Sequence, residues 1–233
     1  MLDDNTLLVT QDHLFPSRAP ALDQLTETYT HIFGATVGPP LAKAVHGTPV
    51  ISKTLSKVET LLGLPISFVS AVELDKPDAP ARIIKRGLAF ANGIAVSPKG
   101  QTIAVAATMD AMIKFYAPQR DAAGKLMGLK LVDKVHVPMV VDNLDFTEPL
   151  WEDEREGGSD LFDGAKLLAG GHPRPLQNLV FAKDPSNMAK QSGTWAVTVE
   201  PASGVPLDKK GKMELSVWRA EQDGAPVPAA KRC

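Results

Sequence analysis

Short apolar runs separated by turn-forming residues recur along most of the chain. From residue 87 onward they are dense, with Pro, Gly, Asp and Lys between them. Runs of this kind, rich in β-branched and aromatic residues, are typical of strands. They predict strands at 5–15, 66–74, 81–88, 93–97, 102–108, 111–118, 128–137, 143–147, 165–172, 179–183, 194–200 and 213–220. The pattern favours an all-β fold, either a sandwich, a barrel or a propeller.

One segment departs from this pattern. Residues 51–63 (ISKTLSKVETLLG) have apolar residues at helical spacing and end in Gly63, so they predict a helix. Residues 21–33 fit either a short helix or a strand. The acidic stretch 148–164 predicts a surface insertion, and its carboxylates lack EF-hand spacing. Residues 223–233 predict a disordered tail, and 1–233 a single domain.

Composition narrows the function classes. The 233 residues are 44% hydrophobic, enough for a substantial core, and their net charge of −2 does not favour nucleic-acid binding. No run of apolar residues is long enough for a membrane span. The N-terminal residues do not have the pattern of a signal peptide. The chain enters a strand-like segment at once, which suggests that a front part is missing. Its one cysteine, Cys233, leaves the compartment open.

Polar residues recur at matching places in two of the predicted strand pairs. Asn92 precedes two short strands that end at Thr108, and Asp142 with Asn143 precedes two that end at His172. Repeats of about 40–50 residues built from short strands are typical of propeller blades. The inner strands of such blades would bring these polar side chains to one hub. Amide and carboxylate oxygens suit a hard cation such as calcium, although Asn and Asp are also common turn residues.

Four sequence words, taken together, resemble one family. FANGIAVSP, VDNLDF and GGHP occur in that order, and NTLLVTQDHLF precedes them. They resemble the paraoxonase/arylesterase family of six-bladed β-propellers over about 100 residues of the chain. The resemblance implies a calcium-dependent hydrolase of lactones and aryl esters, with two calcium ions on the propeller axis. It also suggests a secretory origin.

The resemblance also implies roles for particular residues. It assigns the catalytic calcium to Asn92, Asp142, Asn143 and Gln11, the structural calcium to Asp12, and the lining of the active-site pocket to His172. The family has asparagine where Gln11 stands. The family's calcium-binding glutamate and the histidine pair proposed as its base lie in its first two blades, which this sequence does not contain. His13, His31, His46 and His136 do not match the contexts of that pair.

Three hypotheses therefore stand. The chain has material for about four blades. The first hypothesis is that it is an arylesterase- or lactonase-like hydrolase that takes a small ester or lactone. Alternatively, it is a catalytically incompetent propeller fragment that serves as a binding or scaffold module. The third is an unrelated all-β carbohydrate-binding or structural domain. An incomplete ring would leave open strand edges, which predicts self-association.

Overall fold

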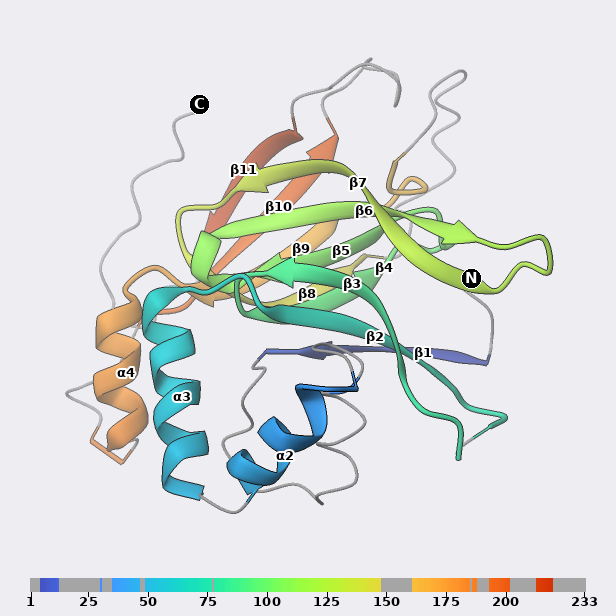
Figure 1. Ribbon diagram of the computed structural model, residues 1–233. Coiled ribbons are helices and arrows are strands. Elements are labelled where there is room, and N and C mark those ends of the chain that lie inside the picture. The colour runs from blue at the N-terminus through green and yellow to red at the C-terminus, as the bar shows by residue number, and fades with distance from the viewer. Residues whose placement is uncertain are drawn as a thin grey trace.

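In the computed structural model, the described residues form three antiparallel sheets (Figure 1). The structure describes residues 5–12, 30, 35–46, 49–76, 78–147, 161–184, 186–187, 193–201 and 213–219. The first sheet has the strand order β1-β2-β3, the second β4-β5-β6-β7 and the third β11-β10-β9-β8. Each sheet is a meander in which strands that follow one another in the sequence pair with each other. The predicted all-β, propeller-like fold is confirmed.

The strands and helices have the following bounds. The first sheet consists of β1 (Thr6–Gln11), β2 (Ser67–Glu73) and β3 (Arg82–Leu88). The second consists of β4 (Ala91–Val96), β5 (Ile103–Ala107), β6 (Met112–Arg120) and β7 (Leu126–His136), with the 3-10 turn η1 (Thr108–Asp110) between β5 and β6. The third consists of β8 (Val140–Phe146), β9 (Leu167–His172), β10 (Trp195–Pro201) and β11 (Met213–Arg219). The helices are α2 (Gly38–His46), α3 (Pro49–Leu62) and α4 (Pro175–Lys183).

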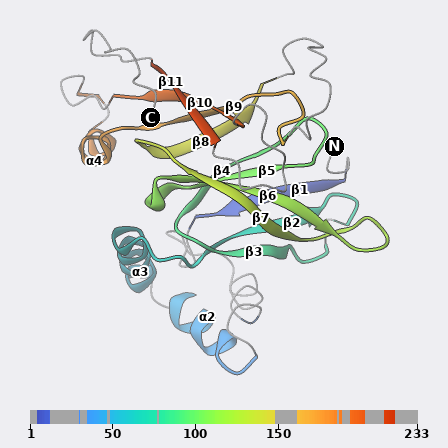
Figure 2. The same cartoon turned by 90° about the horizontal axis from the view of Figure 1, so that it is seen from above.

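The first strands of the three sheets, β1, β4 and β8, form an inner row. β4 contacts both β1 and β8, and the view from above shows the three sheets following one another around this inner row (Figure 2). Innermost strands that meet in this way are the arrangement of propeller blades. Length predicted about four blades, whereas the described residues form three. Between β1 and β2, the described residues form the helices α2 and α3 instead of further strands.

The strand β5 of the second sheet is buried on both of its faces. All five residues of β5 are buried. Ile103 and Val105 pack with Val69 and Leu88 of the first sheet. Ala104 and Ala106 face the other way and pack with residues of the third sheet, including Val141, Leu167 and Val197. The alternation along β5 therefore joins the three sheets through two apolar layers.

One of the three described helices was predicted from the sequence, and another was predicted as a strand. The predicted helix at 51–63 is confirmed as α3, and Gly63 follows it with a left-handed φ of 58°. However, Val58 and Leu62 on its predicted apolar side are exposed. The predicted strand at 179–183 is wrong, because these residues belong to α4, which starts at Pro175. Proline is favoured in the first turn of a helix, and a short apolar run does not separate helix from strand.

Other predicted segments have a partial outcome. Residues 148–160 of the acidic stretch and the tail 223–233 lie outside the described residues, as do 21–29 and 31–33. At the end of the acidic stretch, Phe162 is fully buried and Asp163 nearly so. Asp163 accepts a hydrogen bond from the Lys99 backbone N–H at 2.8 Å, and Thr102 donates to the Leu161 carbonyl at 2.5 Å. This end of the stretch is therefore packed against the β4–β5 turn.

Candidate functional site

Asn92 and Asp142 meet where β4 and β8 lie against each other. The Asn92 side-chain amide donates a hydrogen bond to the Asp142 carboxylate at 2.5 Å, across 50 positions of sequence. Both residues are half-buried. Asn92 is the second residue of β4, not a residue ahead of the strand as its turn-forming character suggested. The expected meeting of these two side chains from separate blades is observed.

Glycine makes this close approach feasible. A Cβ atom on Gly93 would lie 2.4 Å from the Asp142 carbonyl oxygen and 2.8 Å from the Leu144 nitrogen. Both are backbone atoms, so neither can swing aside. Gly171 of β9 does the same on the other side of β8, where an added Cβ would lie 2.2 Å from the Val140 carbonyl oxygen. Two glycines thus let β8 lie in backbone contact with both β4 and β9.

The start of β4 is held by hydrogen bonds that are buried. The Ser67 hydroxyl donates to the Leu88 carbonyl at 2.6 Å and accepts from the Ala91 N–H at 2.7 Å. It therefore ties the end of β3 to the residue before Asn92. Phe90 has a left-handed φ of 58°, which is uncommon for a bulky residue. These features hold the start of β4, where Asn92 lies, against the end of β3.

Thr108 and His172 also lie at this end of the blades. Ala91 pairs with Ala107 and Val140 pairs with His172, so the ends of β5 and β9 lie beside the starts of β4 and β8. Thr108 is buried, and its hydroxyl donates to the Val141 carbonyl at 2.7 Å. The polar residues that end the two repeats therefore both lie next to β8, as the repeat pattern predicts.

His172 has a polar atom that is buried without a partner. Its Nδ1 forms no hydrogen bond within the part of the chain that the structure describes. Buried polar groups are nearly always hydrogen-bonded, so an isolated one calls for an explanation such as a ligand or a water molecule. The imidazole is only half-buried overall. Part of the ring therefore reaches the surface, whereas Nδ1 itself is buried.

The remaining predicted ligands are not drawn into this contact. Gln11 is the last residue of β1 and pairs with Phe68, and both Gln11 and Asp12 are exposed. Asn143 follows Asp142 on β8 at a register irregularity and is exposed. β1 does contact β4, so Gln11 lies on the neighbouring inner strand. The structure thus unites two of the predicted ligand residues and leaves three at the surface.

Asn92 and Asp142 carry donor types that suit a cation. Asp142 has a carboxylate and Asn92 a neutral amide oxygen, which are the donor types that calcium prefers, but the Asn92 atom that contacts Asp142 is the amide nitrogen. Calcium takes about six to eight oxygen ligands, more than this pair supplies. Among the described residues, no group of three or more His, Cys, Asp or Glu side chains could hold a metal ion.

Sequence reasoning missed the residues that shape this end. Ser67 has no motif around it, and nothing in the order of residues shows that its hydroxyl joins β3 to β4. Gly93, by contrast, could be identified from the sequence, since a glycine directly follows the polar Asn92. Met109 was also missed; it is 41% exposed on η1. A Cβ on Gly63 would lie 3.4 Å from its Cβ, so the end of α3 borders the same region.

α3 and α4 lie at one end of the sheets in both views (Figures 1 and 2). α4 begins shortly after His172, and α3 ends beside η1. None of the described helices is long and apolar enough to cross a membrane.

Comparison with known proteins does not assign the chain to a family. No protein-family model matches the sequence, and no curated protein matches it. Among solved structures, a gluconolactonase from Xanthomonas campestris is 17% identical, with a TM-score of 0.34 over 67% of this chain and 36% of that one. Sqt1 from Chaetomium thermophilum is 9% identical, with a TM-score of 0.37 over 67% of this chain and 30% of that one. A luciferin-regenerating enzyme is 10% identical, with a TM-score of 0.32 over 70% of this chain and 54% of that one.

The chain covers little more than half of the luciferin-regenerating enzyme and less of the other two. Because every one of these TM-scores is low, we draw no conclusion about family or activity from them.

Proposed function

We propose that the protein hydrolyses a small ester or lactone at the end of the blades where Asn92, Asp142 and His172 lie. The contact between Asn92 and Asp142 across two blades carries this proposal. The four sequence words that resemble the paraoxonase/arylesterase family support it, because Asn92 and Asp142 are two of the residues to which that resemblance assigns a calcium ion.

The chain's own residues would divide the work as follows. Asp142 and the amide oxygen of Asn92 would hold the cation, with Asn143 and Gln11 as further ligands and Asp12 serving the structural ion. A bound calcium ion would polarise the ester carbonyl and stabilise its developing negative charge. His172 would line the pocket beside them, with the exposed part of its ring toward the substrate. Thr108 keeps β8 in place beside them.

The decisive measurement is hydrolysis of phenyl acetate and a simple γ- or δ-lactone, with calcium and with a chelator. We expect activity only with calcium. Asp142→Ala and Asn143→Ala should each lower the calcium-dependent rate by about a hundredfold or more, the size of effect seen when a group that stabilises the transition state is removed. Asp145→Ala is the matched control, because Asp145 is an exposed carboxylate on the same strand.

A second function is favoured by one observation. Gln11 and Asn143 are exposed, which would suit a chain that has the scaffold of the site without the full ligand set. Such a protein would be a binding module without catalysis. Calcium would then raise the melting temperature of the wild type but not of Asp142→Ala, and neither ester nor lactone would be hydrolysed. If calcium changes neither rate nor melting temperature, both proposals are refuted.

A further inference from the structure

A cluster of cationic side chains lies on one face of β6 and β7. Lys114 is the Cα partner of Lys134, and Met112 is the partner of His136. Alternate residues of a strand project to the same side, and directly paired residues share a face. Lys114, Lys134 and His136 therefore project to one side of the sheet, together with Tyr116.

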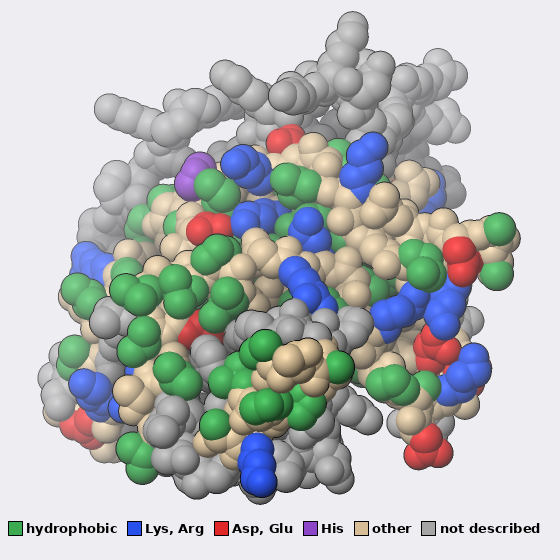
Figure 3. All heavy atoms as spheres, viewed as in Figure 1, with side chains coloured by type: hydrophobic (Ala, Val, Ile, Leu, Met, Phe, Trp, Pro, Cys, Tyr) green, Lys and Arg blue, Asp and Glu red, His purple; other side chains and the backbone are tan. Residues whose placement is uncertain are grey.

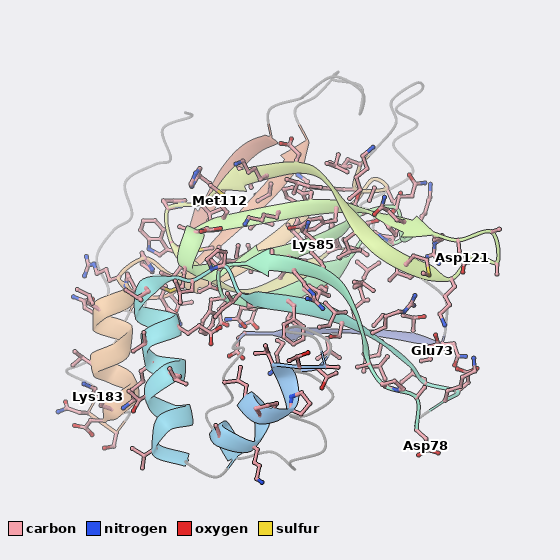
Figure 4. The ribbon with its side chains drawn as sticks, viewed as in Figure 1. Glu73, Asp78, Lys85, Met112, Asp121 and Lys183 are labelled. Atoms are coloured by element: carbon pink, nitrogen blue, oxygen red, sulfur yellow. The ribbon has the colours of Figure 1, made fainter. Side chains whose placement is uncertain are left out.

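This side faces the first sheet. Tyr116 packs in the apolar layer with Val69 and Leu88, whereas Phe115 packs in the layer toward the third sheet. From β3, the Lys85 ammonium lies 5.3 Å from the centroid of the Tyr116 ring. Figure 4 labels Lys85 of β3 and Met112 of β6. A third lysine thus reaches the same face from another sheet.

The cations exceed the carboxylates on this face. Lys114 pairs with Asp110 of η1 at 2.8 Å. Asp133, the acidic residue of β7, is the partner of Phe115 and so projects to the other side, with its carboxylate accepting from the Lys134 N–H at 2.8 Å. Within η1, β6 and β7, Asp110 is therefore the carboxylate that balances the three ammonium groups of Lys85, Lys114 and Lys134.

Like charges directly opposite each other destabilise a sheet. Lys114 and Lys134 hold such positions, although the chain as a whole has a net charge of −2. Figure 3 shows Lys and Arg side chains gathered over β3, β6 and β7, with fewer acidic ones among them. A multiply charged anion would neutralise the positive charge of these lysines and accept hydrogen bonds from their ammonium groups.

We propose that Lys85, Lys114 and Lys134 form a binding site for a phosphate group, with His136 at its edge. The site is separate from the contact between Asn92 and Asp142 and does not depend on the proposed hydrolysis. Lys114 is half-buried and already fixed by Asp110, so it is pre-positioned. Lys134 is exposed and is the side chain that would close on the anion.

The test is calorimetric titration with inorganic phosphate and, separately, with glycerol 3-phosphate, at constant ionic strength set with chloride. We expect the wild type to bind at least one of them. Tighter binding of inorganic phosphate would indicate free phosphate as the ligand, and tighter binding of glycerol 3-phosphate would indicate a phosphate ester. Lys134→Ala should weaken binding about tenfold, which corresponds to about 1.4 kcal/mol. Because Lys134 is exposed, this variant should keep the wild-type melting temperature.

Lys130→Ala is the matched control. Lys130 is an exposed lysine of the same strand, but its partner Ala117 follows Tyr116, so Lys130 projects to the opposite face. It removes the same charge and should leave affinity within about twofold of the wild type, since phosphate would not reach it. Absence of phosphate binding to the wild type would overturn the proposal. Equal weakening by Lys130→Ala and Lys134→Ala would do the same, because it would mean diffuse attraction to surface charge.

Discussion

Replacing Gly93 by alanine tests whether backbone contact between β4 and β8 holds two blades together. The added methyl carbon would lie 2.4 Å from the Asp142 carbonyl oxygen, 2.8 Å from the Leu144 nitrogen and 3.0 Å from the Asn143 Cα. All three belong to the backbone of β8. The strand must therefore move as a whole, and the hydrogen bond between Asn92 and Asp142 must lengthen or break.

The cost follows from these distances. Inserting a methyl group into a packed region costs about 1–3 kcal/mol when side chains can adjust. Here only backbone can adjust, and a hydrogen bond to a carboxylate is lost as well, worth about 1.5–3 kcal/mol. We expect the Gly93→Ala variant to lose about 3 kcal/mol or more of unfolding free energy. For a chain of this size, that is a fall in melting temperature of about 6–12 °C.

The assay is urea unfolding followed by circular dichroism, supported by a thermal scan. Gly170→Ala is the control, since Gly170 is also a strand glycine next to β8 but an added Cβ would meet nothing within 4 Å. It should stay within about 0.5 kcal/mol of the wild type, as surface substitutions usually do. If Gly93→Ala matches Gly170→Ala, the two strands do not lie in backbone contact, and the reasoning about the site fails with it.

Three further substitutions test other parts of the structure. Ser67→Ala should lower the unfolding free energy in urea by about 1–3 kcal/mol, because it leaves the buried Leu88 and Ala91 backbone groups unpaired; a loss below about 0.5 kcal/mol, the size of an ordinary surface effect, would contradict this. Ala111→Gly should raise the melting temperature, because Ala111 has a left-handed φ of 50° that costs an L-residue about 1–2 kcal/mol; an unchanged or lower value would refute it. Burial, reinforced by Asp110, raises the pKa of Tyr116 to about 12, so its contribution to stability is complete below pH 10 and is lost as the pH rises toward 12. Ultraviolet titration of the wild type and of Tyr116→Phe checks this. The tyrosinate absorbance that the variant lacks should develop near pH 12 in the wild type, and its development near pH 10 would contradict the prediction.

The sequence predicted most of the strands because their short runs are bounded by turn residues. It failed at residues 179–183, where four apolar or small residues in a row are compatible with either structure and the helix start at Pro175 decides. It also did not predict α2, whose residues include two consecutive prolines. Such a segment looks like a loop until Pro39 and Pro40 are placed in a first helical turn, where proline is tolerated.

The candidate site was predictable in part for a similar reason. Asn92 and Asp142 were found because each begins a repeat, and repeats place their equivalent residues at one hub. Repetition says nothing about which way the next side chain points, so the exposure of Asn143 at the register irregularity was not foreseen. The roles of Ser67 and Phe90 were also hidden, since both depend on how one blade joins the next.

The burial of β5 on both of its faces has a consequence for how the protein unfolds. Val105 is covered by the first sheet and Ala106 by the third. Loss of either flanking sheet would expose an uninterrupted apolar strand to water, so neither can detach at low cost while the middle persists. We therefore expect the amide protons of β5 to exchange with deuterium only through opening of the whole assembly. A protease that removes one flanking sheet should leave behind a remnant that aggregates instead of a stable smaller protein.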